Sequence, residues 1–120
     1  MRVAIVDDQP MFRRSLHRFL DRQSGLKVVA EADDGQSAVE MVELHKPDVV
    51  LMDISMPILN GIEATRIIMS RFPATQVIIL SMHQDQAFEA QACQAGACRY
   101  ICKDCSPQEI LDAILGHKMA

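Results

Sequence analysis

Three short runs of apolar residues constrain the fold of this chain more than any other feature. They are VAIV (3–6), DVVLM (48–52) and VIIL (77–80), and their apolar residues are continuous rather than alternating. A strand that is apolar on both faces must be covered on both faces, as strands inside a parallel sheet are. LKVVAEA (26–32) and RYICK (99–103) are less apolar, and we expect them to form peripheral strands.

Apolar residues with helical spacing lie between and after these runs. The first expected helix opens near Pro10, the second ends before Pro47, the third ends before Pro73, the fourth covers 85–95, and the fifth follows Ser106 as its N-cap. Five strands that alternate with five helices predict a doubly wound α/β fold. Right-handed crossovers then give a three-layer (βα)5 sandwich with a parallel sheet in the order 2-1-3-4-5.

Length and composition indicate one domain that spans residues 1–120. The chain has 120 residues and a formal net charge of -4, so we expect no nucleic-acid binding by this segment itself. No apolar run approaches the roughly 20 residues of a membrane span. The N-terminal MRVAIVDDQP is interrupted by two aspartates and does not resemble a signal peptide. These features predict a cytoplasmic protein without a membrane segment.

Polar side chains follow four of the expected strands, at the point where each strand ends. They are Asp7 and Asp8, Asp53, Ser81, and Lys103. The carboxyl ends of the strands of an open α/β sheet face one crevice, where the strand order reverses. Any one of these acids could simply cap a helix or a turn. All four strand ends together favour a functional site.

The chemistry of this set indicates phosphoryl transfer. Three neighbouring carboxylates repel one another, and a divalent cation removes that repulsion. Ligands that are all oxygen favour Mg²⁺, with Mn²⁺ as a possible substitute. A carboxylate can attack phosphorus and form an aspartyl phosphate, a reaction that depends on positioning and charge neutralisation. We therefore expect Asp53 to be the nucleophile, with Lys103 and Ser81 contacting the phosphoryl oxygens.

Four segments resemble the motifs of the receiver domains of response regulators, a CheY-like family with the flavodoxin-like fold. They are VDD (6–8), MDISMPILNG (52–61), LSMH (80–83) and YICKD (100–104), in the order and spacing of that family. LSMH and the KD pair are most similar to the NarL/FixJ branch, whose receivers precede a LuxR-type helix-turn-helix.

The resemblance implies a role for each residue of the site in two-component signal transduction. Asp53 is the phospho-acceptor, which a sensor histidine kinase phosphorylates. Asp8, Asp53 and the backbone carbonyl of Ser55 ligate Mg²⁺, and Asp7 acts through a coordinated water. Lys103 contacts the phosphoryl group. The domain is then no enzyme beyond promoting its own phosphorylation and dephosphorylation.

The resemblance also implies a conformational switch. Ser81 and Tyr100 form the switch pair, and the residues at Ser55 and His83 modulate the lifetime of the phosphoryl group. Many receivers have proline after the lysine, but here the residue is Asp104. Because a cis peptide bond costs about 2.5–4 kcal/mol without proline, this departure leaves the conformation of the peptide after Lys103 open.

The partners that the resemblance implies lie outside the chain or require a second copy of it. An output domain, if present, would begin beyond residue 120, and DNA would be contacted only through it. A homodimer is expected on phosphorylation, through helix 4, strand 5 and helix 5 or through helices 1 and 5. We expect Arg13, Arg14 and Arg18 on the outer side of the first helix. Met11, Met41 and Met69 are expected to pack inside.

Two other functions remain open from the sequence. One is a stand-alone, receiver-like interaction module that is never phosphorylated. The other is a metal site built from Cys93, Cys98, Cys102 and Cys105. Cys98 and Cys102 would lie about 13 Å apart along a strand. Two thiolates on one zinc ion cannot be more than about 4.6 Å apart, so the strand and the zinc site exclude each other.

Overall fold

The computed structural model describes residues 1–54, 56, 59–82 and 86–116. Strands and helices alternate in this part of the chain as β1 (Arg2–Val6), α1 (Pro10–Asp21), β2 (Lys27–Ala32), α2 (Gly35–His45), β3 (Val49–Asp53), α3 (Gly61–Arg71), β4 (Gln76–Ser81), α4 (Gln86–Ala95), β5 (Arg99–Cys102) and α5 (Pro107–Ile114). All strand pairs are parallel, and their order is β2-β1-β3-β4-β5. The predicted elements and strand order are confirmed.

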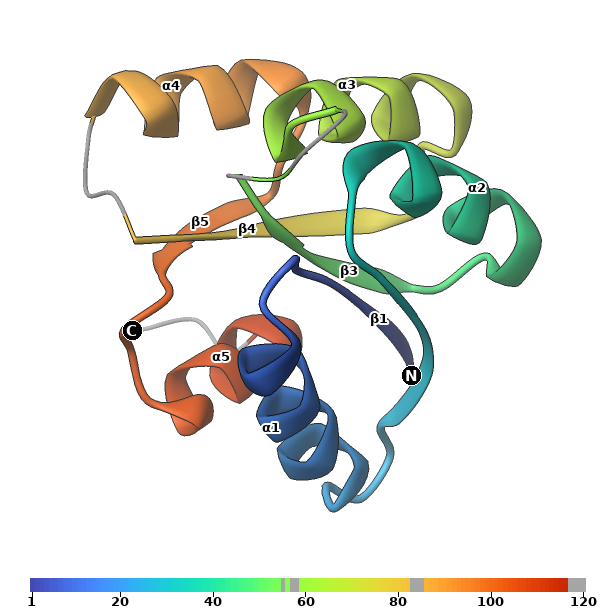
Figure 1. Ribbon diagram of the computed structural model, residues 1–120, viewed down its shortest axis with the longest axis vertical. Helices are drawn as coiled ribbons and strands as arrows, with labels where there is room; N and C mark the ends of the chain where they lie inside the picture. Colours follow the sequence, from blue (N-terminus) through green and yellow to red (C-terminus); the bar gives the residue numbers. More distant parts are fainter. Residues whose placement is uncertain (55, 57–58, 83–85, 117–120) are drawn as a thin grey trace.

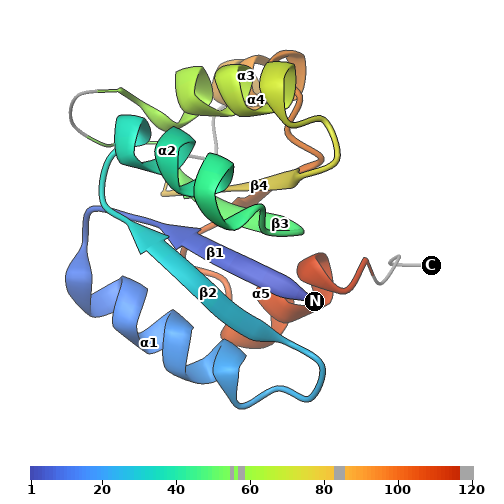
Figure 2. The same ribbon diagram turned by 90° about the vertical axis from the view of Figure 1, so that its right-hand side faces the viewer.

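Helices cover both faces of the sheet, as Figures 1 and 2 show: α1 and α5 lie on one face, and α2, α3 and α4 lie on the other. Successive residues of β1 point to opposite faces. Val3 and Ile5 belong to the apolar cluster beneath α1 and α5, whereas Ala4 and Val6 belong to the cluster beneath the other three helices. β3 is buried along its whole length. The continuous apolar runs therefore reflect strands that are buried on both faces.

Polar caps fix several of the helix ends. Ser106 accepts a hydrogen bond from the backbone N–H of Glu109 at 3.3 Å, which confirms its predicted role as the N-cap of α5. Asn60 caps α3 in the same way through the N–H of Glu63, at 2.9 Å. Gly96 follows α4 with a φ of 109°, the left-handed conformation of a helix stop.

Two predictions about the first helix are wrong. Met11 does not pack inside, because it is 79% exposed. Arg13 does not lie on the outer side, because it turns back over the sheet and pairs with Glu31 of β2 at 2.7 Å. Both residues lie in the first turn of α1, where periodicity alone does not decide burial. Arg14 and Arg18 are exposed, as predicted.

No helix in the described ranges is long and apolar enough to cross a membrane.

All four cysteines are free thiols. Cys93 lies in α4, Cys98 precedes β5, Cys102 ends β5, and Cys105 lies before α5. Within the described residues no cysteine belongs to a group of three potential metal ligands. This arrangement argues against the cysteine metal site.

Candidate functional site

Three carboxylates meet at the carboxyl ends of β1 and β3, the two strands that flank the reversal of strand order. Val6 is in register with Met52, so Asp7 follows β1 beside the position of Asp53 on β3. One carboxylate oxygen from each of Asp7, Asp8 and Asp53 lies within 4.8 Å of the other two. Asp7 and Asp53 are buried, whereas Asp8 is exposed. The predicted acidic cluster is therefore present.

Lys103 brings a buried positive charge to this cluster. Its Nζ lies 2.7 Å from Asp7 Oδ2 and 3.7 Å from Asp53 Oδ2. Its backbone N–H donates to the carbonyl of Ser81 at 2.8 Å, which ties the residue after β5 to the end of β4. The predicted lysine therefore reaches the acids, but its close partner is Asp7 rather than Asp53.

The arrangement fits a hard divalent cation. The cluster offers only carboxylate oxygens, the donor type that Mg²⁺ prefers. Asp7 Oδ2 is buried and has no well-directed hydrogen bond among the described residues, although the ammonium of Lys103 is near. Three carboxylates face one ammonium, so a cation would offset the excess negative charge. The residues present therefore fit the implied metal.

Comparisons with known proteins agree with this geometry. The family model of the response regulator receiver domain matches residues 3–115. The chain belongs to this family. The receiver domain is 39% identical over 114 residues to the transcriptional regulatory protein DegU of Brevibacillus brevis. That match covers 95% of this chain but 48% of DegU, so the chain spans about half the length of this curated relative.

Solved structures of the family share the fold. The receiver domain aligns with a LuxR-family response regulator from Aurantimonas sp. at a TM-score of 0.91 and 40% identity, over 96% of this chain and 82% of that one. It also aligns with the CheX–CheY–BeF3–Mg²⁺ complex from Borrelia burgdorferi at a TM-score of 0.89 and 26% identity, over 97% and 87% of the two chains. The predicted CheY-like fold is thereby confirmed.

Two further residues, Gln9 before α1 and Phe12 within it, also contact Lys103. The Nζ atom donates to Gln9 Oε1 at 2.8 Å and lies 4.6 Å from the centre of the Phe12 ring. The backbone N–H of Gln9 donates to Asp7 Oδ1 at 2.8 Å. Neither Asp7 nor Asp8 is the N-cap of α1, because Gln9 occupies that position. Helix capping therefore does not account for the two acids, although Asp7 caps the turn at Gln9 through this hydrogen bond.

Gly61, the first residue of α3, packs against the end of β3 in this receiver domain. The N–H of Gly61 donates to the carbonyl of Ile54 at 2.9 Å. A Cβ atom at Gly61 would lie 2.0 Å from the backbone oxygen of Asp53. The start of α3 therefore packs directly against the backbone of Asp53, and only glycine leaves room for this approach.

The predicted switch residues lie on the two strands beyond β3. Ser81 is buried at the end of β4. Leu80, the residue before Ser81, is in register with Asp53 on β3. Tyr100 is half-buried in β5 and packs against the cluster beneath α2, α3 and α4. Ser55 and His83 lie outside the described residues. Among those described, no peptide bond is cis, and this includes the bond after Lys103.

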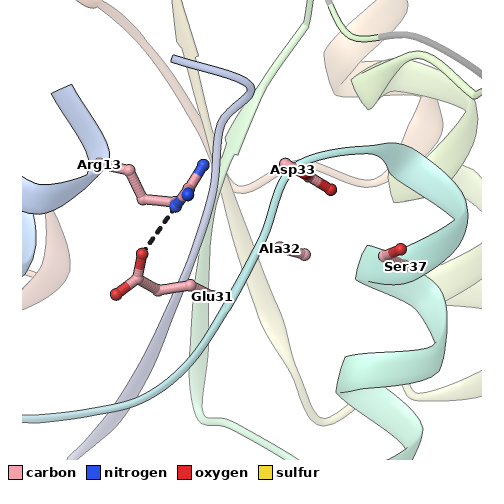
Figure 3. A pocket seen from close by; sticks show the side chains of 5 residues that line it. All are labelled: Arg13, Glu31, Ala32, Asp33 and Ser37. Carbon is pink, nitrogen blue, oxygen red and sulfur yellow. Dashed lines mark hydrogen bonds and ion pairs between the residues drawn. The ribbon is translucent and has the colours of Figure 1, made fainter. Parts of the chain in front are cut away.

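Arg13 links the acidic cluster to the edge of the sheet. Its Nη1 donates to the backbone carbonyl of Asp7 at 2.6 Å, and its Nε donates to Glu31 at 2.7 Å. Figure 3 shows this pair at the rim of a pocket of about 270 Å³ that Asp33 and Ser37 also line. None of Asp7, Asp8 and Asp53 is among the described residues that line this pocket, so it is distinct from the acidic cluster.

Proposed function

We propose that this receiver domain accepts a phosphoryl group on Asp53 from a sensor histidine kinase, with Mg²⁺ bound at the acidic cluster. The observation that supports this most is the meeting of three carboxylates and a buried lysine at the reversal of strand order. A cluster that served stability alone would have no reason to gather three like charges with one counter-charge.

The transfer needs little from the protein beyond placement and charge. A carboxylate oxygen of Asp53 attacks phosphorus and forms the new O–P bond. The P–N bond of the kinase phosphohistidine breaks, and the imidazole nitrogen leaves with the electron pair. The ammonium of Lys103, 3.7 Å from Asp53 Oδ2, donates to a phosphoryl oxygen. The Ser81 hydroxyl, at the end of the adjacent strand, contacts another oxygen.

The metal would be held by carboxylates of Asp8 and Asp53, by the backbone carbonyl of Ser55, and by Asp7 through a water. When bound, Mg²⁺ supplies positive charge that offsets the acids and orients the phosphoryl oxygens. A buried strand presents the carboxylate of Asp53 at the rim of the sheet.

The receiver would pass its state to an output region beyond residue 120. Its relative DegU is a transcriptional regulatory protein, and a LuxR-family regulator shares its fold. Ser81 and Tyr100 would couple the phosphoryl group to the surface of α4, β5 and α5. DNA binding would belong to a LuxR-type output domain, and kinase and regulator would meet in the cytoplasm.

Intact-mass measurement tests the proposal. The protein is incubated with acetyl phosphate or phosphoramidate, with Mg²⁺ or with EDTA. A gain of one phosphoryl group is expected with Mg²⁺, and its loss is expected in Asp53→Asn and with EDTA. Equal labelling of Asp53→Asn would refute the assignment. Absence of labelling in the wild-type chain would favour an interaction module that is never phosphorylated.

A further inference from the structure

Gln9 occupies a helix position for which its side chain is poorly suited. Ser, Thr, Asp and Asn are preferred at N-caps because a short side chain can accept from the first free N–H groups. Gln9 is the N-cap of α1 and makes no side-chain cap hydrogen bond. Its side-chain oxygen instead accepts from Lys103 Nζ at 2.8 Å. The contact with the lysine, not helix capping, accounts for this side chain.

Three groups hold the ammonium of Lys103 on the α1 side of the site. They are Asp7 Oδ2 at 2.7 Å, Gln9 Oε1 at 2.8 Å and the face of the Phe12 ring, whose centre is 4.6 Å away. The distance to Asp53 Oδ2 is 3.7 Å, which is too long for a hydrogen bond. Lys103 is therefore hydrogen-bonded on the α1 side of the site, and its contact with Asp53 is the longer of its two ion pairs.

We propose that Gln9 is a positioning residue that holds Lys103 in this resting place and so competes with the phosphoryl group for the ammonium. The proposal rests on the phosphorylation proposed above for Asp53. An ammonium has three donors; one of them points to Gln9, and Asp7 holds the ammonium by charge at 2.7 Å without a well-directed hydrogen bond. Removal of the neutral acceptor frees one donor for the phosphoryl group, while the charged partner Asp7 stays in place.

Two substitutions at Gln9 should change phosphoryl-mimic binding in opposite directions. Gln9→Met keeps the length of the side chain and its neutral charge but removes the acceptor. We expect it to bind beryllofluoride about three- to tenfold more tightly at saturating Mg²⁺. Gln9→Glu offers a charged acceptor that holds the ammonium more strongly, and we expect binding about tenfold weaker. Titration calorimetry measures both, with the Mg²⁺ affinity determined separately for each variant.

Gln76 provides a matched control. It is exposed at the first residue of β4, at the opposite end of the strand from Ser81. Gln76→Met and Gln76→Glu repeat the same chemical changes away from the site and should leave beryllofluoride affinity unchanged. Weaker or unchanged binding by Gln9→Met, relative to Gln76→Met, would overturn the proposed competition.

A double-mutant cycle tests the resting contact without any phosphoryl group. Urea unfolding is measured without Mg²⁺ for the wild type, Gln9→Met, Lys103→Met and the double variant. The effects of the two single changes on the free energy of unfolding should be non-additive, because both changes remove the same hydrogen bond between Gln9 and Lys103. Additive effects would show that the contact is absent. If the wild type binds no beryllofluoride at all, the phosphorylation proposal fails, whatever the cycle shows.

Discussion

At the scale of single residues, the acidic cluster of Asp7, Asp8 and Asp53 carries more negative charge than Lys103 can balance. Asp7 and Lys103 are 1% and 7% exposed, so both charges have lost most of their hydration. Loss of one partner of such a buried pair typically costs about 3–5 kcal/mol. Asp8 and Asp53 add two further carboxylates within 4.8 Å. The excess negative charge of these carboxylates therefore favours the binding of a cation.

Mg²⁺ should stabilise the folded domain, and Asp8 should be needed for that effect. A ligand that binds only the native state raises its stability as the ligand concentration exceeds Kd. Asp8→Asn should raise metal-free stability by up to about 1 kcal/mol, because it removes one like charge at an exposed position. It should also abolish most of the Mg²⁺-dependent rise in Tm. Thermal melts with and without Mg²⁺ measure both effects, and an unchanged Mg²⁺ response would exclude Asp8 as a ligand.

Gly61→Ala should distort the backbone at Asp53. The added Cβ atom would lie 2.0 Å from the carbonyl oxygen of Asp53, and side-chain rotation cannot relieve a clash with backbone. We expect a loss of about 2–3 kcal/mol in the free energy of unfolding. Gly25→Ala, where no atom lies within 4 Å but φ is 83°, should cost about 1 kcal/mol. Urea denaturation compares the two, and equal losses would argue against the close contact at Gly61.

The sequence predicts which residues form the acidic cluster, but it does not predict the contacts between them. Asp7, Asp53 and Lys103 could be predicted because strand ends are visible as the ends of apolar runs. The pairing of Lys103 with Asp7 could not be predicted, because the distances from Lys103 Nζ to Asp7 and to Asp53 differ by only about 1 Å. The contact between Gln9 and Lys103 was not predicted. A glutamine at a helix N-cap is unusual, and this is a weak sign that its side chain contacts a group outside the helix.

At the scale of elements, polar contacts fasten α1 to the edge strand β2. Glu31 of β2 accepts from Arg13, and its other oxygen contacts the ring of His17. His17 also contacts Asp21 at 3.1 Å, and Asp21 accepts from the backbone N–H of Val28 at 3.0 Å. Because Arg13 also reaches the carbonyl of Asp7, this clamp extends from the edge of the sheet to the acidic cluster.

The clamp should depend on pH through His17. The hydrogen bond and charge of Glu31, with a smaller effect of Asp21, raise the pKa of His17 above 6.5, against a lowering by burial. The native state therefore keeps this proton to a higher pH than the unfolded chain does. The stabilisation is fully present below pH 6.5 and is lost as pH rises through the folded pKa. Because the ring is one-third exposed, we expect less than about 1 kcal/mol.

Urea unfolding of the wild type and His17→Gln at pH 5.5, 6.5, 7.5 and 8.5 measures this contribution. The stability difference between the two proteins should shrink as pH rises. His45→Gln, which removes a histidine at the end of α2, is the matched control and should follow the wild type. A wild-type advantage that grows with pH would contradict the sign of the His17 shift.

The elements themselves were predictable because each carries a local signal. Continuous apolar runs predict strands buried on both faces, and Ser106 and Gly96 predict a helix start and a helix stop. The first turn of α1 was not predictable in detail. Met11 and Arg13 lie two residues apart, on nearly opposite sides of the helix, and contacts with β2 and with the backbone of Asp7 decide which one is exposed.

At the scale of the whole molecule, the described surface offers no strong reason for the unphosphorylated domain to associate tightly. The large exposed apolar residues of the described ranges come from separate parts of the sequence and are Met1, Met11, Leu44, Met82 and Leu115. A LuxR-type output would use paired half-sites, so association on phosphorylation is the natural consequence. Sedimentation velocity should show a monomer or weak dimer that associates further with beryllofluoride and Mg²⁺. A tight dimer at nanomolar concentration without the mimic would contradict this.

The most direct test of the whole account is to locate the phosphoryl group on the chain. The protein is phosphorylated with phosphoramidate and Mg²⁺ and is then treated with borohydride, which reduces an acyl phosphate to an alcohol. Peptide mass spectrometry then identifies the altered residue. We predict reduction at Asp53 alone, none in Asp53→Asn, and none when EDTA replaces Mg²⁺. Reduction at Asp7, Asp8 or another acid, with Asp53 unchanged, would contradict the account.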